Sequence, residues 1–172
     1  MAHAFSDYPE IEYLSGKPYP KVSPKRTHAL VQAAFTLVLH RCGAGLGNAG
    51  PEWRFKLRPG TEFVPDVAFV SFDRLRMLTD EEAEEPPFAP DIAIEVRSPS
   101  RRAAYDASKI REYLQHGAQL ALDVDPKARV IYAHDAAGTM ITFRSGERFT
   151  HHAFPWLTFE VDEVFADLKI PR

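Results

Sequence analysis

Two stretches of the chain have hydrophobic residues at helical spacing. The first follows Ser23-Pro24, a serine that suits a helix N-cap and a proline that suits the first turn, and it ends at Gly43. Its apolar positions are Leu30, Ala33, Ala34, Leu37 and Val38. The second runs from about Ser100 to His116 and ends at Gly117. Its buried stripe would be Ala103, Ala107, Ile110 and Leu114. The pattern predicts two main helices.

Short apolar or alternating runs predict strands elsewhere. The most strand-like run covers residues 91–97, in which Ile92, Ile94 and Val96 share one face and Asp91, Ala93, Glu95 and Arg97 share the other. Further strands are expected over residues 53–57, 63–70, 120–124, 130–133 and 156–161. The other expected elements are a loop over 43–51, a helical turn within 71–79, an acidic loop over 80–88 and a short helix over 162–168. This order of helices and strands predicts a mixed α/β fold with one central sheet.

Length and composition narrow the class of protein. A chain of 172 residues has the length of a single domain, and 45% hydrophobic with 26% charged residues excludes a disordered chain, a collagen-like repeat and a coiled coil. The longest nearly apolar run, residues 29–39, is far shorter than the roughly 20 residues of a membrane span, so we expect no membrane helix. The start of the chain has no signal-peptide pattern. The single cysteine, Cys42, excludes an internal disulfide and CxxC zinc sites, and we expect a cytoplasmic protein.

Basic residues gather in two groups, although the net charge is −3 and the isoelectric point is near 6.2. This overall balance argues against a protein that coats nucleic acid. The first group consists of Lys21, Lys25, Arg26 and His28, and the second of Arg97, Arg101, Arg102, Lys109 and Arg111. Each group could be an ordinary solvated surface, or it could follow a DNA backbone.

Three acids lie where a carboxylate is costly, because Asp66, Asp91 and Glu95 belong to apolar strands. A buried carboxylate must be paired, protonated or bound to a metal. If the two strands are neighbours, Asp66 and Glu95 converge and repel one another, and a divalent cation would relieve the repulsion. Oxygen-only ligation favours Mg²⁺ or Mn²⁺ over zinc. The alternative is that each acid pairs with a basic neighbour, for example Glu95 with Arg97 or Lys109.

Lys109 is expected at the margin of the buried stripe of the second helix. From there it could extend over the sheet toward the end of the preceding strand, where Glu95 lies. It could equally be a surface lysine that pairs with Asp106, three residues earlier.

Several segments together resemble one family. The most specific is Pro90-Asp91-Ile92-Ala93-Ile94-Glu95-Val96-Arg97-Ser98-Pro99-Ser100, followed by Asp106-Ala107-Ser108-Lys109. The other matching segments are Glu12-Tyr13-Leu14-Ser15-Gly16-Lys17, Ser23-Pro24 with His28, Pro65-Asp66, Tyr113, Gly117 and Asp125-Pro126. Over nearly the whole chain, this set resembles the Uma-two type restriction endonucleases of the PD-(D/E)XK nuclease superfamily. The chain departs from that family at Ser15 and Lys17, where acids are usual, and at Leu120-Ala121, where an aromatic pair is usual.

The resemblance implies a restriction-endonuclease-like mixed sheet flanked by helices, with added N- and C-terminal strands. The resemblance makes Asp66 and Glu95 the motif acids. Together with the backbone carbonyl of Val96, they would hold one or two Mg²⁺ (or Mn²⁺) ions. Glu12 would be an additional acid near the metal. Arg97 stands at the superfamily's usual lysine position, and Lys109 would replace that lysine. The implied reaction is metal-assisted hydrolysis of phosphodiester bonds in DNA.

The same hypothesis assigns partners. The DNA backbone would contact Lys25, Arg26, His28, Arg101 and Arg102. A homodimer is expected, because a domain of this size has little surface to grip both strands and a double-strand break needs two sites. Two other functions stay open: a nuclease fold without activity that acts as a DNA-binding or assembly module, which Arg97, Ser15 and Lys17 would support, and a small-molecule or protein-interaction domain.

Overall fold

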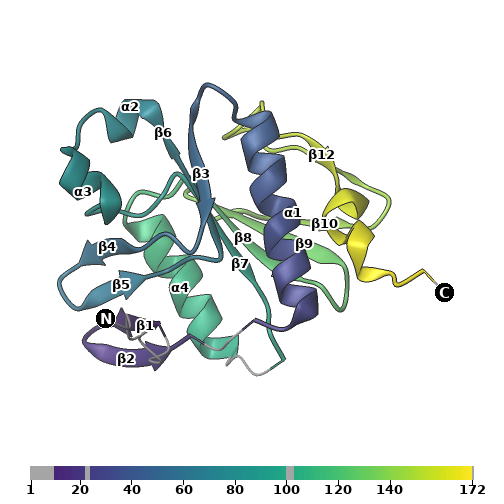
Figure 1. The fold of residues 1–172 in the computed structure, drawn as a ribbon, viewed down its shortest axis with the longest axis horizontal. Coiled ribbons are helices and arrows are strands. Elements are labelled where there is room, and N and C mark those ends of the chain that lie inside the picture. The colour runs from purple at the N-terminus through teal and green to yellow at the C-terminus, as the bar shows by residue number, and fades with distance from the viewer. Residues whose placement is uncertain (1–9, 22–23, 100–102, 172) are drawn as a thin grey trace, which may run out of the picture.

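A six-stranded mixed sheet forms the centre of the fold (Figure 1). The computed structural model describes residues 10–21, 24–99 and 103–171. The strands lie side by side in the order β10 (Met140–Arg144), β9 (Val130–Asp135), β8 (Leu120–Asp125), β7 (Ile92–Val96), β6 (Val67–Ser71) and β3 (Gly47–Pro51). Strands β7 and β8 run parallel, because helix α4 (Ala103–Gln115) connects them as a crossover. The other neighbouring pairs of this sheet are antiparallel.

Different helices cover the two faces of the central sheet. Helix α1 (Arg26–Cys42) packs on the face that carries Ile92, Ile94 and Val96, and the 3₁₀ helix η1 (Val161–Leu168) lies beside it. Helix α4 covers the opposite face. Since side chains alternate along a strand, Glu95 points away from α1 and toward α4. Among the described helices, none is long and apolar enough to cross a membrane.

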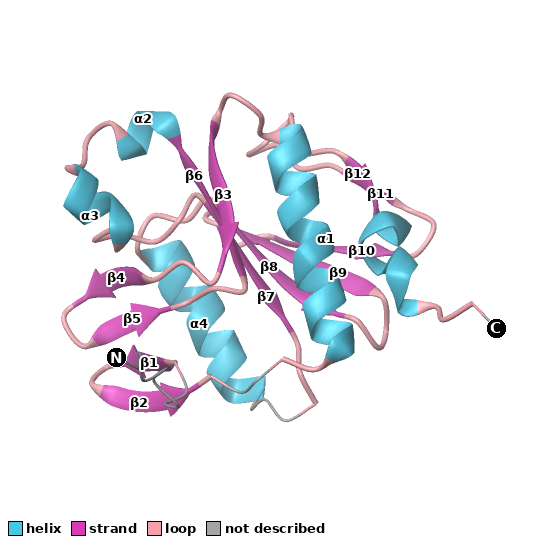
Figure 2. Cartoon of the chain, viewed as in Figure 1, coloured by secondary structure: helices cyan, strands magenta, loops and turns pink. Residues whose placement is uncertain are grey.

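A smaller antiparallel sheet lies on the α4 side (Figure 2). Its strand order is β2 (Lys17–Pro20), β1 (Ile11–Leu14), β5 (Thr61–Phe63) and β4 (Phe55–Arg58). Phe55 and Phe63 of this sheet share a buried cluster with Tyr113 of α4. Near the C-terminus, β11 (Arg148–Phe149) pairs with β12 (Phe159–Glu160). The predicted mixed α/β fold with added N- and C-terminal strands is confirmed.

The structure corrects three predicted elements. The strand expected over 63–70 is broken at residues 64–66, because Pro65 has no N–H for the ladder. The loop expected over 43–51 contains β3, an edge strand whose turn-like composition conceals it. The acidic segment expected as a loop contains helix α3 (Asp80–Glu84), which begins with a capping box between Thr79 and Glu82. The helical turn expected within 71–79 is α2 (Phe72–Leu75).

The two expected helix starts also differ from the observed ones. Helix α1 begins at Arg26 with Lys25 as its N-cap, and the expected cap, Ser23, lies outside the described residues. The expected start of the second helix, Ser100, also lies outside them, and the described helix begins at Ala103.

Gly47 allows strand β3 to approach β6 closely. A Cβ atom at this position would lie 2.2 Å from the carbonyl oxygen of Val70 and 2.6 Å from the Phe69 ring. The nearer of these two atoms belongs to the backbone, which cannot move aside as a flexible side chain can. At Gly50, in the same strand, a Cβ would meet nothing within 4 Å.

We therefore expect Gly47→Ala to lower the free energy of unfolding by about 1–3 kcal/mol through overpacking. Gly50→Ala is the matched control, and it should stay within about 0.5 kcal/mol of the unsubstituted protein. Urea unfolding of both variants measures the difference. An equal loss of unfolding free energy in the two variants would contradict this explanation. The loss would then come from replacing any glycine of this strand, and not from the close approach of β3 to β6.

Candidate active site

The break between β5 and β6 places Asp66 opposite the end of β7. Antiparallel pairing joins Val67 to Ile94, so Asp66 comes level with Glu95. The Asp66 side chain is only 1% exposed, and its Oδ2 accepts a hydrogen bond from the backbone N–H of Val96 at 2.7 Å. Nε2 of His28 lies 3.1 Å from the same oxygen. Because a carboxylate only accepts hydrogen bonds, His28 is the donor, and it reaches Asp66 from helix α1.

Glu95 is buried on the other side of this position, where helix α4 supplies its partners. Nζ of Lys109 lies 2.6 Å from Oε1 of Glu95, and the hydroxyl of Tyr113 donates to the same oxygen at 2.7 Å. Burial, followed by the negative charges of Glu95 and Glu12, raises the pKa of Tyr113 well above its ordinary value. The hydroxyl therefore stays protonated and remains a donor to Glu95.

Lys109 is completely buried, with 0% of its surface exposed. The alternative of a surface lysine paired with Asp106 is therefore wrong. The expected apolar stripe of this helix is correct at Ile110 and Leu114 and wrong at its two alanines. Ala103 and Ala107 are exposed, whereas Lys109, Ile110 and Tyr113 are buried. The helix turns its lysine inward because two carboxylates lie there to pair with it.

Glu12 of strand β1 is the second partner of Lys109. Its Oε1 accepts from Lys109 Nζ at 2.7 Å and from the backbone N–H of Val64 at 2.8 Å, and its Oε2 accepts from the Tyr105 hydroxyl at 2.8 Å. Burial opposes the ionisation of Glu12, but the charges of Lys109 and Lys21 and these hydrogen bonds outweigh it and lower the pKa of Glu12. Glu12 is therefore a carboxylate at neutral pH.

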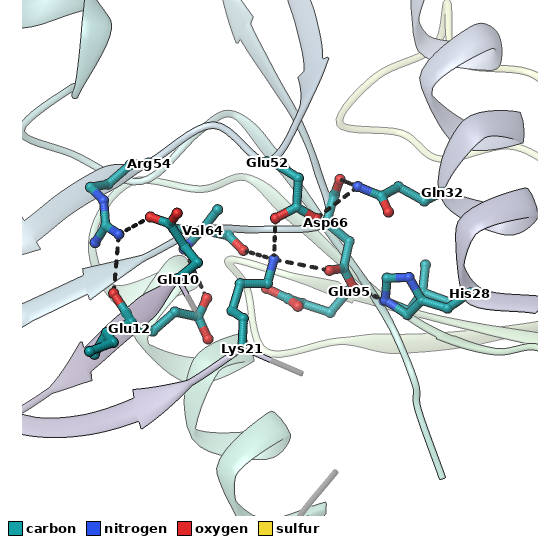
Figure 3. A network of polar contacts seen from close by, with 12 residues as sticks. Glu10, Glu12, Lys21, His28, Gln32, Glu52, Arg54, Val64, Asp66 and Glu95 are labelled. Atoms are coloured by element: carbon teal, nitrogen blue, oxygen red, sulfur yellow. Dashed lines mark hydrogen bonds and ion pairs between the residues drawn. The ribbon is translucent and has the colours of Figure 1, made fainter. Parts of the chain in front are cut away.

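A second lysine, Lys21, lies among the acids from the end of strand β2 (Figure 3). Its Nζ donates to the backbone carbonyl of Val64 at 2.7 Å and to Glu52 Oε2 at 2.8 Å, and it lies 3.3 Å from Asp66 Oδ1. Burial opposes its charge, but Asp66, Glu95, Glu52 and Glu12 outweigh burial and raise the pKa of Lys21. The ammonium group is therefore charged at neutral pH.

The atoms around this ammonium group are the ligands that a hard divalent cation takes. They are carboxylate and backbone carbonyl oxygens on rigid strand ends. Lys21 thus stands in for a cation in the described structure, and the donor set fits Mg²⁺ or Mn²⁺ better than a metal that prefers nitrogen or sulfur.

Glu52 adopts a backbone conformation that a glutamate rarely takes, with φ at 55°. Such a left-handed conformation costs roughly 1–2 kcal/mol for a non-glycine residue. Contacts at the site hold it there. Glu52 Oε2 accepts from Lys21, and Oε1 accepts at 2.9 Å from Gln32 Nε2, which also donates to the Asp66 carbonyl at 2.9 Å. The strain is therefore stored next to the acids, as is common at functional sites.

The other predicted site residues divide into two groups. His28 and the backbone of Val96 join the acids, as described above. Arg97 turns away from them: its guanidinium forms a two-bond pair with Asp123 at 2.7 and 2.8 Å, reaches Asp125 at 3.3 Å and covers the Tyr132 ring. Glu95 therefore pairs with Lys109 and not with Arg97.

The basic residues expected to contact DNA lie either at the start of α1 or outside the described residues. Lys25 and Arg26 are exposed at the start of α1, where Arg26 donates to the carbonyl of Asp167. Arg101 and Arg102 lie outside the described residues.

Asp91, the third acid in an apolar strand, lies at the opposite end of β7 from the site. It pairs with Arg74 at 3.0 Å and accepts the backbone N–H of Ser71 at 2.7 Å. Of the two interpretations for such an acid, a structural ion pair applies to Asp91.

The sequence analysis missed four members of the cluster: Lys21 as a partner of the acids, Glu52, Gln32 and Tyr113. Gln32 and Tyr113 could have been found, because each follows a site residue by one helical turn, His28 in α1 and Lys109 in α4. Lys21 and Glu52 carry no comparable local signal, since each follows a strand of unremarkable composition and only the tertiary fold brings them together.

Comparisons with known proteins agree with this geometry. A family model described as "Putative restriction endonuclease", that of the Uma2 family, matches residues 2–162. Among solved structures, a "putative nuclease belonging to DUF820" from Anabaena variabilis has a TM-score of 0.81 and 23% sequence identity, over 94% of this chain and 92% of that chain. At this identity, the likeness establishes the fold. No curated protein matches the chain. Because the family model covers nearly the whole sequence, this protein belongs to the Uma2 family.

Proposed function

We propose that this protein is an endonuclease that hydrolyses phosphodiester bonds in DNA with Mg²⁺ or Mn²⁺. The carrying observation is that Asp66, directly before β6, and Glu95, in the neighbouring strand β7, lie together next to Lys21, with the buried ammonium group of Lys109 bound to Glu95. Hard oxygen ligands beside a fixed cation suit metal-assisted hydrolysis of a phosphate ester. Membership of the family supports nuclease activity in general, and the metal and the DNA substrate are our proposal.

Asp66 and Glu95 would hold the metal, with the backbone carbonyl of Val96 as a further ligand and Glu12 as an additional acid behind Glu95. The bound ion would supply polarisation of the scissile phosphate and a water of lowered pKa. The protein keeps its ligands in position beforehand: the Val96 N–H and His28 orient Asp66, and the Tyr113 hydroxyl orients Glu95. Such fixed positions avoid reorganisation during the reaction.

Lys109 is the cation that we assign to catalysis. Its protons are held at Nζ between Glu12 and Glu95, so it orients the Glu95 carboxylate and compensates charge that develops on the phosphate and the attacking water. Arg97 is bound to Asp123 and Asp125 and stays protonated, so it supplies only a fixed charge outside the cluster. Asp123, Asp125 and the Tyr132 ring are the partners of the Arg97 guanidinium at that position.

We propose that exposed Lys25 and Arg26, with Arg101 and Arg102, contact DNA phosphates. We propose that His28, beside Asp66, contacts the DNA as well. We also propose a cytoplasmic homodimer, since two sites are needed to cut both strands and the chain has a single cysteine, Cys42. Light scattering at micromolar concentration tests the dimer, and a mass of 19.4 kDa would contradict it.

The structure also favours a second candidate, a DNA-binding module of the same fold that does not cleave. The ammonium group of Lys21 fills the position of a cation, and Arg97 is engaged away from the acids. Cleavage of supercoiled plasmid that requires added Mg²⁺ or Mn²⁺ separates the two candidates, because a module without activity binds the plasmid and leaves it intact.

Asp66→Asn and Glu95→Gln should each lower Mn²⁺ affinity at least about tenfold, since even the loss of an outer partner of a metal ligand costs about 10–100-fold. Plasmid cleavage should disappear together with the Mn²⁺ affinity. The matched control is Asp73→Asn, a carboxylate that is 93% exposed. Isothermal titration with Mn²⁺ and a plasmid assay give the two readouts. Unchanged Mn²⁺ binding in both site variants would contradict the proposed ligands.

Lys109→Met should cut the single-turnover cleavage rate by about 10²-fold or more, on the scale of losing one group that stabilises charge in the transition state, with nearly unchanged DNA affinity. Methionine keeps the length of the side chain, and circular dichroism verifies that the variant folds without its buried charge. Arg97→Met should weaken DNA binding and change the rate little. If Arg97→Met abolishes cleavage and Lys109→Met is near normal, the assignment is reversed.

Lys21→Met should raise Mn²⁺ affinity about tenfold, because it removes a positive charge from the position that the metal would take. The metal-free protein should melt at a lower temperature, since its carboxylates lose a counter-charge. Lys25→Met, at an exposed lysine four residues away, is the control and should change neither value. Unaltered Mn²⁺ affinity in Lys21→Met would show that Lys21 and the metal occupy different places.

A further inference from the structure

A cluster of one acid and two histidines lies away from the active site. Asp135 ends strand β9, and His151 and His152 follow β11. In the sheet, Asp135 pairs with Leu120 at the beginning of β8, whereas Glu95 pairs with Asp123 near the other end of that strand. The cluster is therefore at the opposite end of the central sheet from Glu95.

Two buried polar atoms in this cluster have no hydrogen-bond partner among the described residues: Oδ2 of Asp135 and Nε2 of His151. Both residues are more than nine-tenths buried, at 3% and 4% exposure. The two atoms face one another at 3.9 Å, which is too long for a hydrogen bond. Leaving such atoms unsatisfied costs about 1–3 kcal/mol each, and one cation bound between them would satisfy both.

The spacing of the three side chains suits one metal ion. Nε2 of His152 lies 3.8 Å from Asp135 Oδ2, and one ligand atom from each residue can be chosen so that all lie within 4.8 Å of one another. A point equidistant from three atoms so spaced lies at most about 2.5 Å from each, against about 2.0–2.2 Å for bonds from Zn²⁺ to nitrogen or oxygen. Side-chain shifts of a few tenths of an ångström therefore close the site.

The other atoms of the two buried side chains hold them in position. Oδ1 of Asp135 accepts the backbone N–H groups of Ala137 and Thr139 at 3.0 and 2.9 Å, which leaves Oδ2 directed at the histidines. Nδ1 of His151 accepts the backbone N–H of Ala153 at 3.2 Å, which leaves Nε2 on the side of Asp135.

We propose that Asp135, His151 and His152 form a second metal site, which binds Zn²⁺ and leaves a fourth position for water. Two imidazoles and one carboxylate suit Zn²⁺ and related transition metals, whereas the oxygen-rich cluster at Asp66 suits Mg²⁺ or Mn²⁺. The His152 side chain is 72% exposed, so the ion reaches the buried ligands from solvent.

The site would fasten the segment after β11 to the end of β9. Phe154 and Leu157 of that segment belong to the main hydrophobic core, so the ion would stabilise the edge of the core. Binding at Nε2 of His151 also moves the ring proton to Nδ1, which in the metal-free protein accepts the N–H of Ala153 at 3.2 Å. That hydrogen bond is then lost, and the amide signal of Ala153 in an NMR spectrum reports occupancy.

The test is titration of the whole protein with Zn²⁺ in excess Mg²⁺, followed by calorimetry and by the Ala153 amide signal. We expect one equivalent of Zn²⁺ to bind, with a shift of that signal. His152→Ala should weaken binding at least about tenfold, and this exposed residue can be removed without disturbing the core. His40→Ala, an exposed histidine on α1, is the control and should bind as the unsubstituted protein does.

Asp66→Asn separates this proposal from the proposed nuclease function, because Zn²⁺ binding that survives this substitution is not at the catalytic acids. The proposal is overturned if no Zn²⁺ binds in excess Mg²⁺, if His152→Ala binds Zn²⁺ normally, or if binding is lost in Asp66→Asn and kept in His152→Ala.

Discussion

The ion pairs of buried Lys109 with Glu12 and Glu95 are the interaction on which the rest of the site depends. None of the three charges is tolerable alone in an apolar interior, and removing one partner of such a group typically costs about 3–5 kcal/mol. The three residues come from α4, β1 and β7, so the group joins the small sheet, the helix and the central sheet at one point. Packing alone would allow these parts to slide, whereas charge pairing fixes them.

The irregular backbone next to these ion pairs also holds the site together. Between β5 and β6, the chain gives up ladder pairing at residues 64–66, and its polar groups turn to the site. The N–H of Val64 binds Glu12, the carbonyl of Val64 binds Lys21, and Gln32 binds the carbonyl of Asp66. A continuous strand would have used these groups in the sheet. Pro65 therefore does more than interrupt a strand, because it makes the backbone available to the charged side chains around it.

The architecture and the central acids could be predicted from the sequence because their signals are local. Asp66 and Glu95 stand out as charges in apolar segments, and the alternation of residues 91–97 gives the face on which Glu95 lies. The burial of Lys109 could not be predicted in this way. Helical periodicity weighs a lysine as a polar residue and assigns it to the margin, whereas its pairing with Glu95 and the distant Glu12 buries it. Lys21 and Glu52 were missed for the same reason, since contacts across 31 positions of the chain define their roles.

The charge balance of the site explains why a stable fold can still be ready for a cation. The cluster holds four carboxylates, Glu12, Glu52, Asp66 and Glu95, against the two ammonium groups of Lys21 and Lys109. Counted over these six described side chains, the formal excess is two negative charges, which is the charge of one divalent ion. The charges of Lys109 and Lys21 lower the pKa of buried Glu12, so it remains ionised in the interior. A site with matched charges would attract a divalent cation less strongly, and a site with no lysines would be less stable without a cation because its carboxylates repel one another. Two lysines among four acids meet both requirements.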